Sequence, residues 1–186
     1  FNRADTLKEV FNAVQIARPS KLFLIQDGAR ADRAGEQKQV AACRKVVENI
    51  DWDCEVTRDY SDINLGCGKR MSSGLTNAFK KVDRLIILED DCVPNQSMFP
   101  FCAELLERYK GDERINMISG MNHIGRADFN GDSYCFCKTG AIWGWATWKR
   151  VWDLYEFDMP FFKDKYIMDN FINSRFSKYY INNSIS

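Results

Sequence analysis

The sequence has little of what zinc proteins and membrane-spanning proteins require. It contains one histidine, His123, and none of its seven cysteines forms a Cys-x-x-Cys pair, so a zinc site is not expected. No apolar run approaches the ~20 residues of a membrane span. We interpret the cysteines as small buried thiols in a reducing compartment and His123 as a structural or solvated residue.

The chain also lacks an excess of either charge. It has 26 Lys and Arg and 26 Asp and Glu, whereas nucleic-acid binders usually carry a basic surplus. Its 45% hydrophobic and 28% charged residues are typical of a soluble globular protein, and 186 residues fit one domain. The chain starts Phe-Asn-Arg, without Met or a signal-like stretch, and we interpret it as a fragment or a trimmed chain.

Helical and strand patterns alternate along the first two thirds of the chain. We expect helices over about 6–17, 35–50, 71–82 and 97–110, and strands over 21–26, 54–60, 84–88 and 115–119. Thr6 and Glu9 form a capping box for the first helix. "SYCFCK" is a further candidate strand, and 140–155 is expected to be a turn that leads into an aromatic helix. Aliphatic strands between amphipathic helices predict an α/β fold with a parallel sheet covered on both faces.

An acidic cluster ends one of the expected strands. Glu89, Asp90 and Asp91 follow the apolar run "LIIL". Ligands of parallel sheets bind at the carboxyl ends of the strands. Neighbouring carboxylates raise one another's pKa unless a cation compensates them, and Mg²⁺ and Mn²⁺ prefer such oxygen ligands. The cluster therefore predicts a metal or ligand site, with a solvated acidic loop as the alternative.

Other polar residues are expected at the same edge. Asp27 follows the preceding aliphatic strand, and residues 1–3 stand just before the first helix. Lys69 and Arg70 lie after the 54–60 strand and could offset phosphate charge. Each basic residue alone could equally be a solvated surface charge. Together these segments supply the groups that a nucleotide diphosphate needs.

Four segments in this order resemble the GT-A glycosyltransferases: "FNRADTL", "IQDGAR", "NLGCGKRMSSGLTNAF" and "LIILEDDCVP". More narrowly, the chain resembles the inverting N-acetylglucosaminyltransferase I-like group and bacterial family 2-type enzymes over residues 1–155, and "GAIWGWATWKRVW" is similar to their Gly/Trp-rich segment. The resemblance implies one domain, 1–186, with a Rossmann-like, mostly parallel sheet that lacks its usual opening strand and has helices on both faces. Residues 1–119 would bind the nucleotide sugar, and 120–186 would be a truncated acceptor-side half.

The resemblance also implies an activity and its site. It indicates a metal-dependent, inverting hexosyltransferase that uses Mn²⁺ or Mg²⁺ and moves a sugar, most readily from a UDP-sugar, to a glycan, lipid-linked or other hydroxyl acceptor. Asp91 would hold the metal, and Glu89 and Asp90 would face the nucleoside and donor sugar. Asp27 would bond the base, typically uracil. Further nucleotide-sugar contacts are expected from Phe1, Asn2, Arg3 and Arg70. Such an enzyme would be cytoplasmic, with peripheral membrane association as an alternative, or lumenal in the Golgi of a eukaryote.

The catalytic base has no clear match among these motifs. Asp153, Asp158 and Asp169 are the candidates, of which we prefer Asp169, and a base beyond Ser186 is the alternative. Trp143, Gly144 and Trp145 precede the expected aromatic helix, where exposed rings can stack on sugars and glycine permits close approach. They are expected to line the donor-sugar or acceptor pocket, with core packing as the competing explanation.

Three other functions remain open at this stage. An inactive nucleotide-sugar-binding domain would need no base. A sugar nucleotidylyltransferase of similar fold usually has a glycine-rich phosphate loop, which "FNRADTL" lacks. A response-regulator receiver would also bind Mg²⁺ through acidic residues at strand ends, but its acidic set would stand earlier in the chain.

Overall fold

The computed structural model describes residues 1–122, 125 and 131–160. Residues 1–153 belong to one compact unit, which holds the helices and strands below, and the described residues 154–160 belong to a second unit. His123 and Asp169 lie outside the described residues. Within the described part of the chain, no helix has the length and apolar character to cross a membrane.

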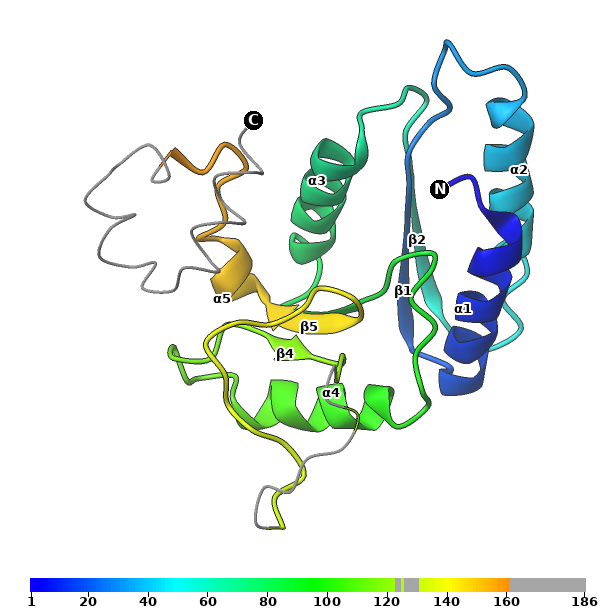
Figure 1. Cartoon of the computed structure of the whole chain (residues 1–186). Coiled ribbons are helices and arrows are strands. Elements are labelled where there is room, and N and C mark those ends of the chain that lie inside the picture. The colour runs from blue at the N-terminus through cyan, green and yellow to red at the C-terminus, as the bar shows by residue number, and fades with distance from the viewer. Residues whose placement is uncertain (123–124, 126–130, 161–186) are drawn as a thin grey trace. The chain divides into compact units, whose positions relative to one another are not determined.

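The order of elements follows the expected alternation as far as the acidic cluster (Figure 1). The elements are α1 (Ala4–Ala17), β1 (Lys21–Gln26), α2 (Glu36–Val46), β2 (Glu55–Tyr60), α3 (Cys67–Phe79), β3 (Arg84–Ile87), α4 (Met98–Arg108), β4 (Ile118–Ser119), β5 (Trp145–Trp148) and α5 (Lys149–Trp152). The structure is thus mixed α/β, with a parallel two-stranded sheet and a separate antiparallel three-stranded sheet.

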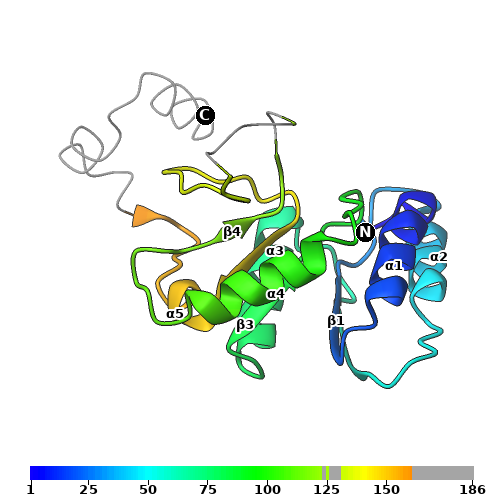
Figure 2. The same cartoon turned by 90° about the horizontal axis from the view of Figure 1, so that it is seen from below.

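The parallel sheet pairs β1 with β2 and is covered on both faces. Lys21 lies opposite Glu55 at one end of the register, and Gln26 lies opposite Tyr60 at the other. Leu22 and Leu24 pack in the core cluster of Phe11 from α1, whereas Ile25 packs on α3. Two-residue alternation along β1 therefore separates the α1 side from the α3 side, and Figures 1 and 2 show α1 and α2 together on one side.

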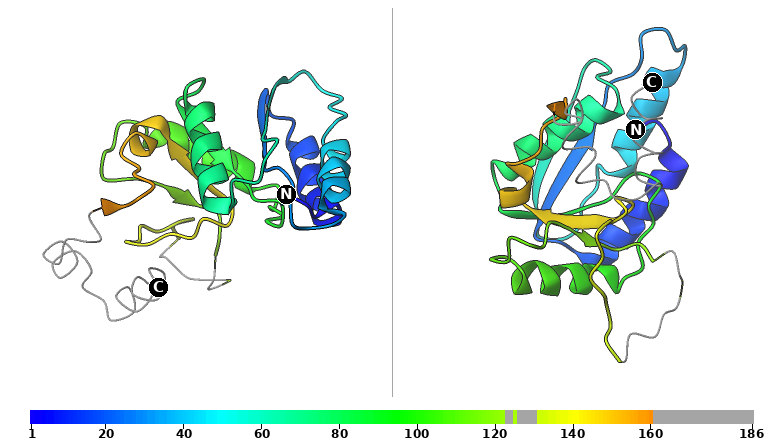
Figure 3. Two further views of the ribbon diagram at one scale, coloured as in Figure 1. Left: turned by 90° about the horizontal axis from the view of Figure 1, so that it is seen from above. Right: turned by 60° about the vertical axis from the view of Figure 1, so that its left-hand side comes forward.

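Helix α3 also contacts the second sheet. Its residues Leu75 and Phe79 form a core cluster with Ile87 of β3, and Ile25 of β1 packs against the same cluster. The three-stranded sheet has α4 on its other face, where Cys102, Leu105 and Leu106 pack with Trp148. Figure 3 shows α3 from two further directions. One helix thus joins the apolar faces of both sheets, which positions the ends of β1 and β3 near each other.

A close helix–strand contact at Gly74 gives a first prediction. A Cβ atom added there would lie 2.4 Å from Ile25 Cγ2. Because overpacking a well-filled core typically costs ~1–3 kcal/mol, Gly74→Ala should lower the free energy of unfolding by about that amount in urea denaturation. Gly111→Ala is the control, since nothing lies within 4 Å of a Cβ added there. Equal stability of the two variants would contradict the packing of α3 on β1.

The expectation of a mostly parallel sheet is corrected in the second half. β5 pairs antiparallel with both β3 and β4, in the order β3-β5-β4. Because β5 opposes both, β3 and β4 run in the same direction, as the β3–α4–β4 alternation predicted. The error was that no strand was predicted at β5, which comes later in the chain and inserts between β3 and β4. The pairing also crosses the expected division at 119/120, since Trp145 lies opposite Ile87.

The turn and aromatic helix expected over 140–155 are present only in part. Residues Trp145–Trp148 are a strand, and the helix covers only Lys149–Trp152. Trp145 packs with the α3 cluster and Trp148 with the α4 cluster, so the aromatics alternate between two faces.

Three smaller expectations also fail. The helix α1 begins at Ala4 with Arg3 at the N-cap and no side-chain cap, so Thr6 and Glu9 form no capping box. The strand expected over 115–119 keeps only Ile118–Ser119. "SYCFCK" forms no strand, although all of its residues are described. In each case the local sequence pattern was present, but the hydrogen-bond partners that the predicted cap or strand needs were not.

Candidate functional site

The carboxyl ends of β1 and β3 meet at the first residues of the chain. Gln26, the last residue of β1, donates from Nε2 to the Phe1 carbonyl at 2.8 Å. The Phe1 ammonium group lies 2.5 Å from Asp90 Oδ2, just beyond β3. Gln96, in the loop after the acidic cluster, donates to the Ala13 carbonyl of α1 at 3.0 Å. The expected convergence of residues 1–3 with the acidic cluster is present.

Arg3 lies between two of the three carboxylates. Its guanidinium is 2.5 Å from Asp90 Oδ1 and 3.1 Å from Asp91 Oδ2. Burial by itself would raise the pKa of the Asp90 carboxyl, but hydrogen bonds and charge from its neighbours, Arg3 among them, outweigh it and leave that pKa below the usual value. Asp90 is therefore an ionised group that holds Arg3, whereas Asp91 keeps a more exposed side chain.

Glu89 is the uncompensated member of the cluster. Its carboxylate makes no ion pair or hydrogen bond with any residue of the described ranges. Burial, and then the negative charges of Asp91 and Asp90, raise the pKa of the Glu89 carboxyl, while Arg3 opposes them. The site thus carries more negative charge than its own cations balance. A bound cation would relieve this excess.

The raised pKa predicts a stability effect with a definite sign. A folded-state pKa above the ordinary 4.5 means that ionised Glu89 destabilises the fold at pH 7, and that this effect disappears below the unfolded-state pKa. Glu89→Gln should therefore raise the melting temperature at pH 7 and leave it nearly unchanged at pH 3.5, measured by circular dichroism. Glu113→Gln, at an exposed position, should change neither value. A lower melting temperature for Glu89→Gln at pH 7 would contradict this assignment.

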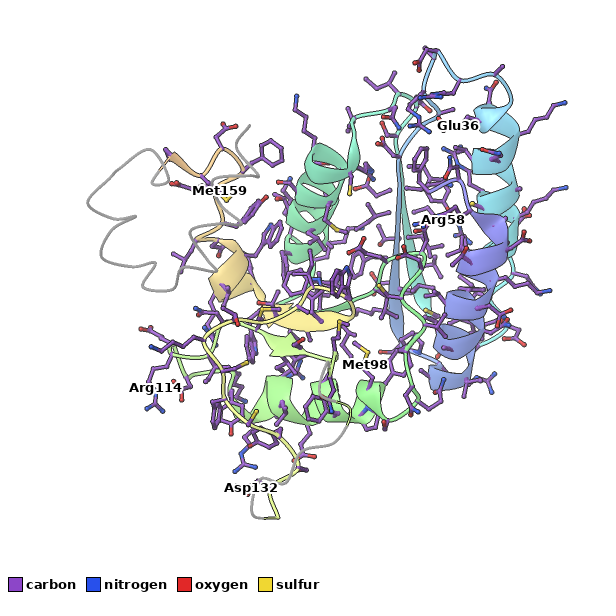
Figure 4. The ribbon with its side chains drawn as sticks, viewed as in Figure 1. Glu36, Arg58, Met98, Arg114, Asp132 and Met159 are labelled. Atoms are coloured by element: carbon purple, nitrogen blue, oxygen red, sulfur yellow. The ribbon has the colours of Figure 1, made fainter. Side chains whose placement is uncertain are left out.

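A buried polar network fixes residue 2 beside the cluster. Asn2 Nδ2 donates to Glu36 Oε1 at 3.0 Å, and Arg30 pairs with the same carboxylate. Glu36 is only 3% exposed, and Figure 4 labels it at the start of α2. Hydrogen bonds from the Arg30 side chain and backbone lower the pKa of Glu36 to about 2. Arg30 also lies 5.9 Å from the centre of the Phe1 ring. This network was not predicted from the sequence, although Arg30 ends the "IQDGAR" segment and Glu36 follows it by six residues.

Asp27 has a structural position. Its Oδ1 accepts N–H bonds from Gly28 at 3.0 Å and Leu65 at 2.9 Å, and its Oδ2 accepts one from Gly66 at 2.9 Å. The side chain is buried and joins the end of β1 to the loop before α3. A contact with a nucleotide base could use only the capacity that remains on Oδ2.

Arg70 also lies away from any open surface. Its side chain is 9% exposed and 2.5 Å from Asp59 Oδ1, and its Nε donates to the Gln26 carbonyl at 3.2 Å. These bonds tie α3 to the ends of β1 and β2. The neighbouring Lys69 is exposed. The structure therefore gives Arg70 a role in holding the strand ends, and we do not include it among the residues proposed to contact phosphate.

The aromatic segment is divided between a cavity and the core. Trp143 and Gly144 line an open cavity of about 610 Å³ together with Asp91. Trp145 belongs to β5 and packs against the α3 cluster instead. Sequence reasoning grouped the three because they are adjacent, but the strand begins only at Trp145, and Gly144 turns the backbone before it with φ of +76°. It also missed Met98, Phe101 and Met121 in the cavity wall, which carry no signal that distinguishes them from core residues.

The candidate bases are not assembled at this cavity in the described part. Asp153 pairs with Lys149 at 2.6 Å on α5 and does not line the cavity. Asp158 is described but belongs to the second unit, and Asp169 lies outside the described residues. The identity of a base therefore stays a prediction.

The carboxylates present fit part of a divalent cation site. Among the described residues there is no group of three or more His, Cys, Asp or Glu that could hold a metal alone. Magnesium is usually bound through one or two carboxylates together with substrate phosphates. The partly exposed Asp91 and the uncompensated Glu89 match that incomplete ligand set.

Comparisons of the chain with protein-family models, curated proteins and solved structures find no match.

Proposed function

We propose that this chain is the nucleotide-sugar-binding part of a GT-A-type glycosyltransferase, which uses Mn²⁺ or Mg²⁺ and a UDP-sugar and transfers the sugar with inversion to an acceptor hydroxyl. One observation carries the proposal. Glu89 and Asp91 follow the carboxyl end of β3, and Asp91 pairs with Arg3 and lines an open cavity. Excess carboxylate, a half-exposed cationic side chain and space for a ligand occur together there.

The strand order supports this placement. From β1 the chain passes outward to β2, and from β3 it passes outward to β4, before β5 returns and inserts between β3 and β4. In open α/β sheets, ligands bind at the carboxyl ends of the strands where the order reverses. In the described residues, β1 and β3 each keep one edge without a strand partner. We propose that the two sheets are parts of one GT-A-type sheet. The opening strand of the family would occupy its centre, between β1 and β3.

The chemistry assigns a task to each residue of the cluster. Asp91, with Glu89, would hold the cation, which when bound stabilises the negative charge that develops on the departing diphosphate. Arg3 is 52% exposed at its side chain and can present its guanidinium to phosphate oxygens. Asp90, held by Arg3, orients it and acts as a positioning residue. The acceptor hydroxyl must lose a proton to a base, for which Asp169 stays the candidate in this sequence.

Calorimetry tests the donor half of the proposal. UDP should bind in the presence of Mn²⁺ and much more weakly with EDTA, and ADP should bind more weakly than UDP under both conditions. Absence of UDP binding, or equal binding of UDP and ADP, would overturn the proposed donor class. Release of UDP from a panel of UDP-sugars then separates an enzyme from a nucleotide-sugar-binding domain, since the latter binds without turnover.

A further inference from the structure

The cavity beside Asp91 is built from four segments of the chain. They are the loop after the acidic cluster, the start of α4, residues 120–121 after β4, and residues 143–144 before β5. Its volume of about 610 Å³ falls in the range of small-molecule sites, roughly 300–1,000 Å³. It is therefore large enough for a ligand group in addition to the diphosphate placed at Arg3.

Most of the cavity wall is apolar. It includes Leu88, Val93, Met98, Phe101, Met121 and Trp143. Three of these side chains are open to solvent: Val93 is 58% exposed, Trp143 54% and Met121 37%. Large apolar side chains gathered at one concave place favour a ligand that removes them from water.

Two glycines keep this space open. The Gly120 N–H donates to the Gly144 carbonyl at 2.8 Å, which brings the two backbones together. A Cβ added at Gly120 would lie 2.9 Å from Met98 Cε, and one added at Gly144 would lie 3.1 Å from the same atom. Gly144 also has φ of +76°, which disfavours other residues. Figure 4 labels Met98 at the start of α4, close to β5. Any side chain at these positions would collide with Met98 or narrow the cavity.

The polar groups in the wall indicate which end a ligand's polar part would occupy. Asn95 Oδ1 accepts hydrogen bonds from the Ser97 N–H and hydroxyl, both at 3.0 Å, so these residues satisfy each other. Asp91 supplies the carboxylate of the wall, and the described lining contains no Lys, Arg or His. A diphosphate would find no cation in this apolar part. The cavity suits a ligand with hydroxyls near Asp91 and an apolar body beyond them.

We propose that this cavity is the acceptor site, and that the acceptor carries an alkyl or aromatic group that lies against Met98, Met121 and Trp143 while its hydroxyl end faces Asp91. The assignment rests on the proposed function for the identity of the ligand as an acceptor. The prediction that the cavity binds a sugar or alcohol joined to an apolar group rests on the cavity wall alone.

Methyl-labelled methionine provides a direct test. The chain has six methionines, of which Met98 and Met121 line the cavity, while Met71 belongs to α3 and packs against the cluster of Leu75, Phe79 and Ile87. With ¹³C-methyl-methionine protein, n-octyl β-D-glucoside below its micellar concentration should shift the Met98 and Met121 signals and leave Met71 unchanged. Methyl β-D-glucoside carries the same sugar and should bind about tenfold more weakly or worse, because its alkyl group is too short to bury the wall.

Two variants make the test specific. Val93→Ser, at an exposed position, should weaken octyl glucoside binding severalfold without changing the fold. Gly144→Ala should reduce it more strongly, since its Cβ intrudes toward Met98. Gly111→Ala is the matched control and should bind normally, because its Cβ meets nothing within 4 Å. If Gly144→Ala proves unfolded by circular dichroism, Val93→Ser alone decides the matter.

The outcomes separate this proposal from the donor proposal. Equal binding of the octyl and methyl glucosides, shifts away from Met98 and Met121, or normal binding by Val93→Ser would overturn the acceptor assignment, whatever UDP does. Selective octyl glucoside binding without any UDP binding would support the cavity's chemistry and reject the glycosyltransferase role. If both ligands bind selectively, and octyl glucoside does not displace UDP, the result supports the donor proposal and the acceptor proposal together.

Discussion

Asp91→Asn is expected to remove the Mn²⁺-dependent part of UDP binding. Asp91 is the partly exposed carboxylate between Arg3 and the cavity, and its substitution takes away a charged cation ligand without changing side-chain size. Loss of an outer-sphere partner already costs a metal site ~10–100-fold in affinity, so loss of a direct ligand should cost on the order of 100-fold. Titration calorimetry of UDP with Mn²⁺ measures this difference.

The matched control for this substitution is Asp53→Asn. Asp53 is exposed and precedes β2, so it lies at the amino end of the strands rather than at the carboxyl end. The Asp53→Asn variant should bind UDP as the wild type does. Unchanged Mn²⁺-dependent binding by Asp91→Asn would reject the assignment of Asp91 as a metal ligand. An equal loss of UDP affinity in Asp53→Asn would instead show that the loss does not come from the candidate site.

Arg70→Met is expected to destabilise the fold by about 3 kcal/mol, at the lower end of the ~3–5 kcal/mol that removal of one partner of a buried ion pair typically costs. The substitution leaves the Asp59 carboxylate without its nearest cation and removes the bond to the Gln26 carbonyl. Urea denaturation at pH 7 measures the loss. Arg114→Met is the control: Arg114 is 87% exposed at its side chain, and such surface pairs contribute ~0–1 kcal/mol.

The effect of Arg70→Met should depend on pH. Burial raises the pKa of Asp59, but hydrogen bonds from Asn77 and Arg70 and the charge of Arg70 outweigh it and leave that pKa below the ordinary 3.8. Stability from the ion pair is therefore present above pH 3.8 and is lost as the pH falls through the lowered value. The difference between wild type and variant should shrink in acid. A folded Arg70→Met protein of normal stability that fails to bind UDP would restore the phosphate role implied by the family resemblance.

Much of the parallel half of the fold was predictable from local pattern. Aliphatic runs such as "KLFLIQ" have the length and composition of buried strands, and amphipathic helices stand between them. The alternation of helix and strand predicted that Asp27 and the acidic cluster follow the carboxyl ends of two strands, and they do follow β1 and β3, although these strands belong to separate sheets. These features follow from hydrophobic periodicity and from the short reach of the connections, which act within about thirty residues of chain.

The antiparallel half was not predictable in this way. Trp145–Trp148 pairs with strands that lie far earlier in the chain, and nothing local to "WATW" indicates which partners it has. The segment stood where the expected turn leads into the aromatic helix, and its pairing with β3 and β4 made it a strand instead. The same pairing separated Trp143 and Gly144 from Trp145, so the cavity wall could not be assigned from adjacency alone.

The sequence by itself determined the chemical content of the candidate site: three carboxylates after an apolar strand, with Arg3 ahead of the first helix. Tertiary structure decided which of those groups pair with one another and which stay unpaired. Asp90 is held by Arg3, Glu89 is left uncompensated, and Arg70 is drawn beneath the strand ends by Asp59. The physical reason is that charge and hydrophobicity belong to a residue, whereas burial and partnership depend on segments that meet only when the chain is folded.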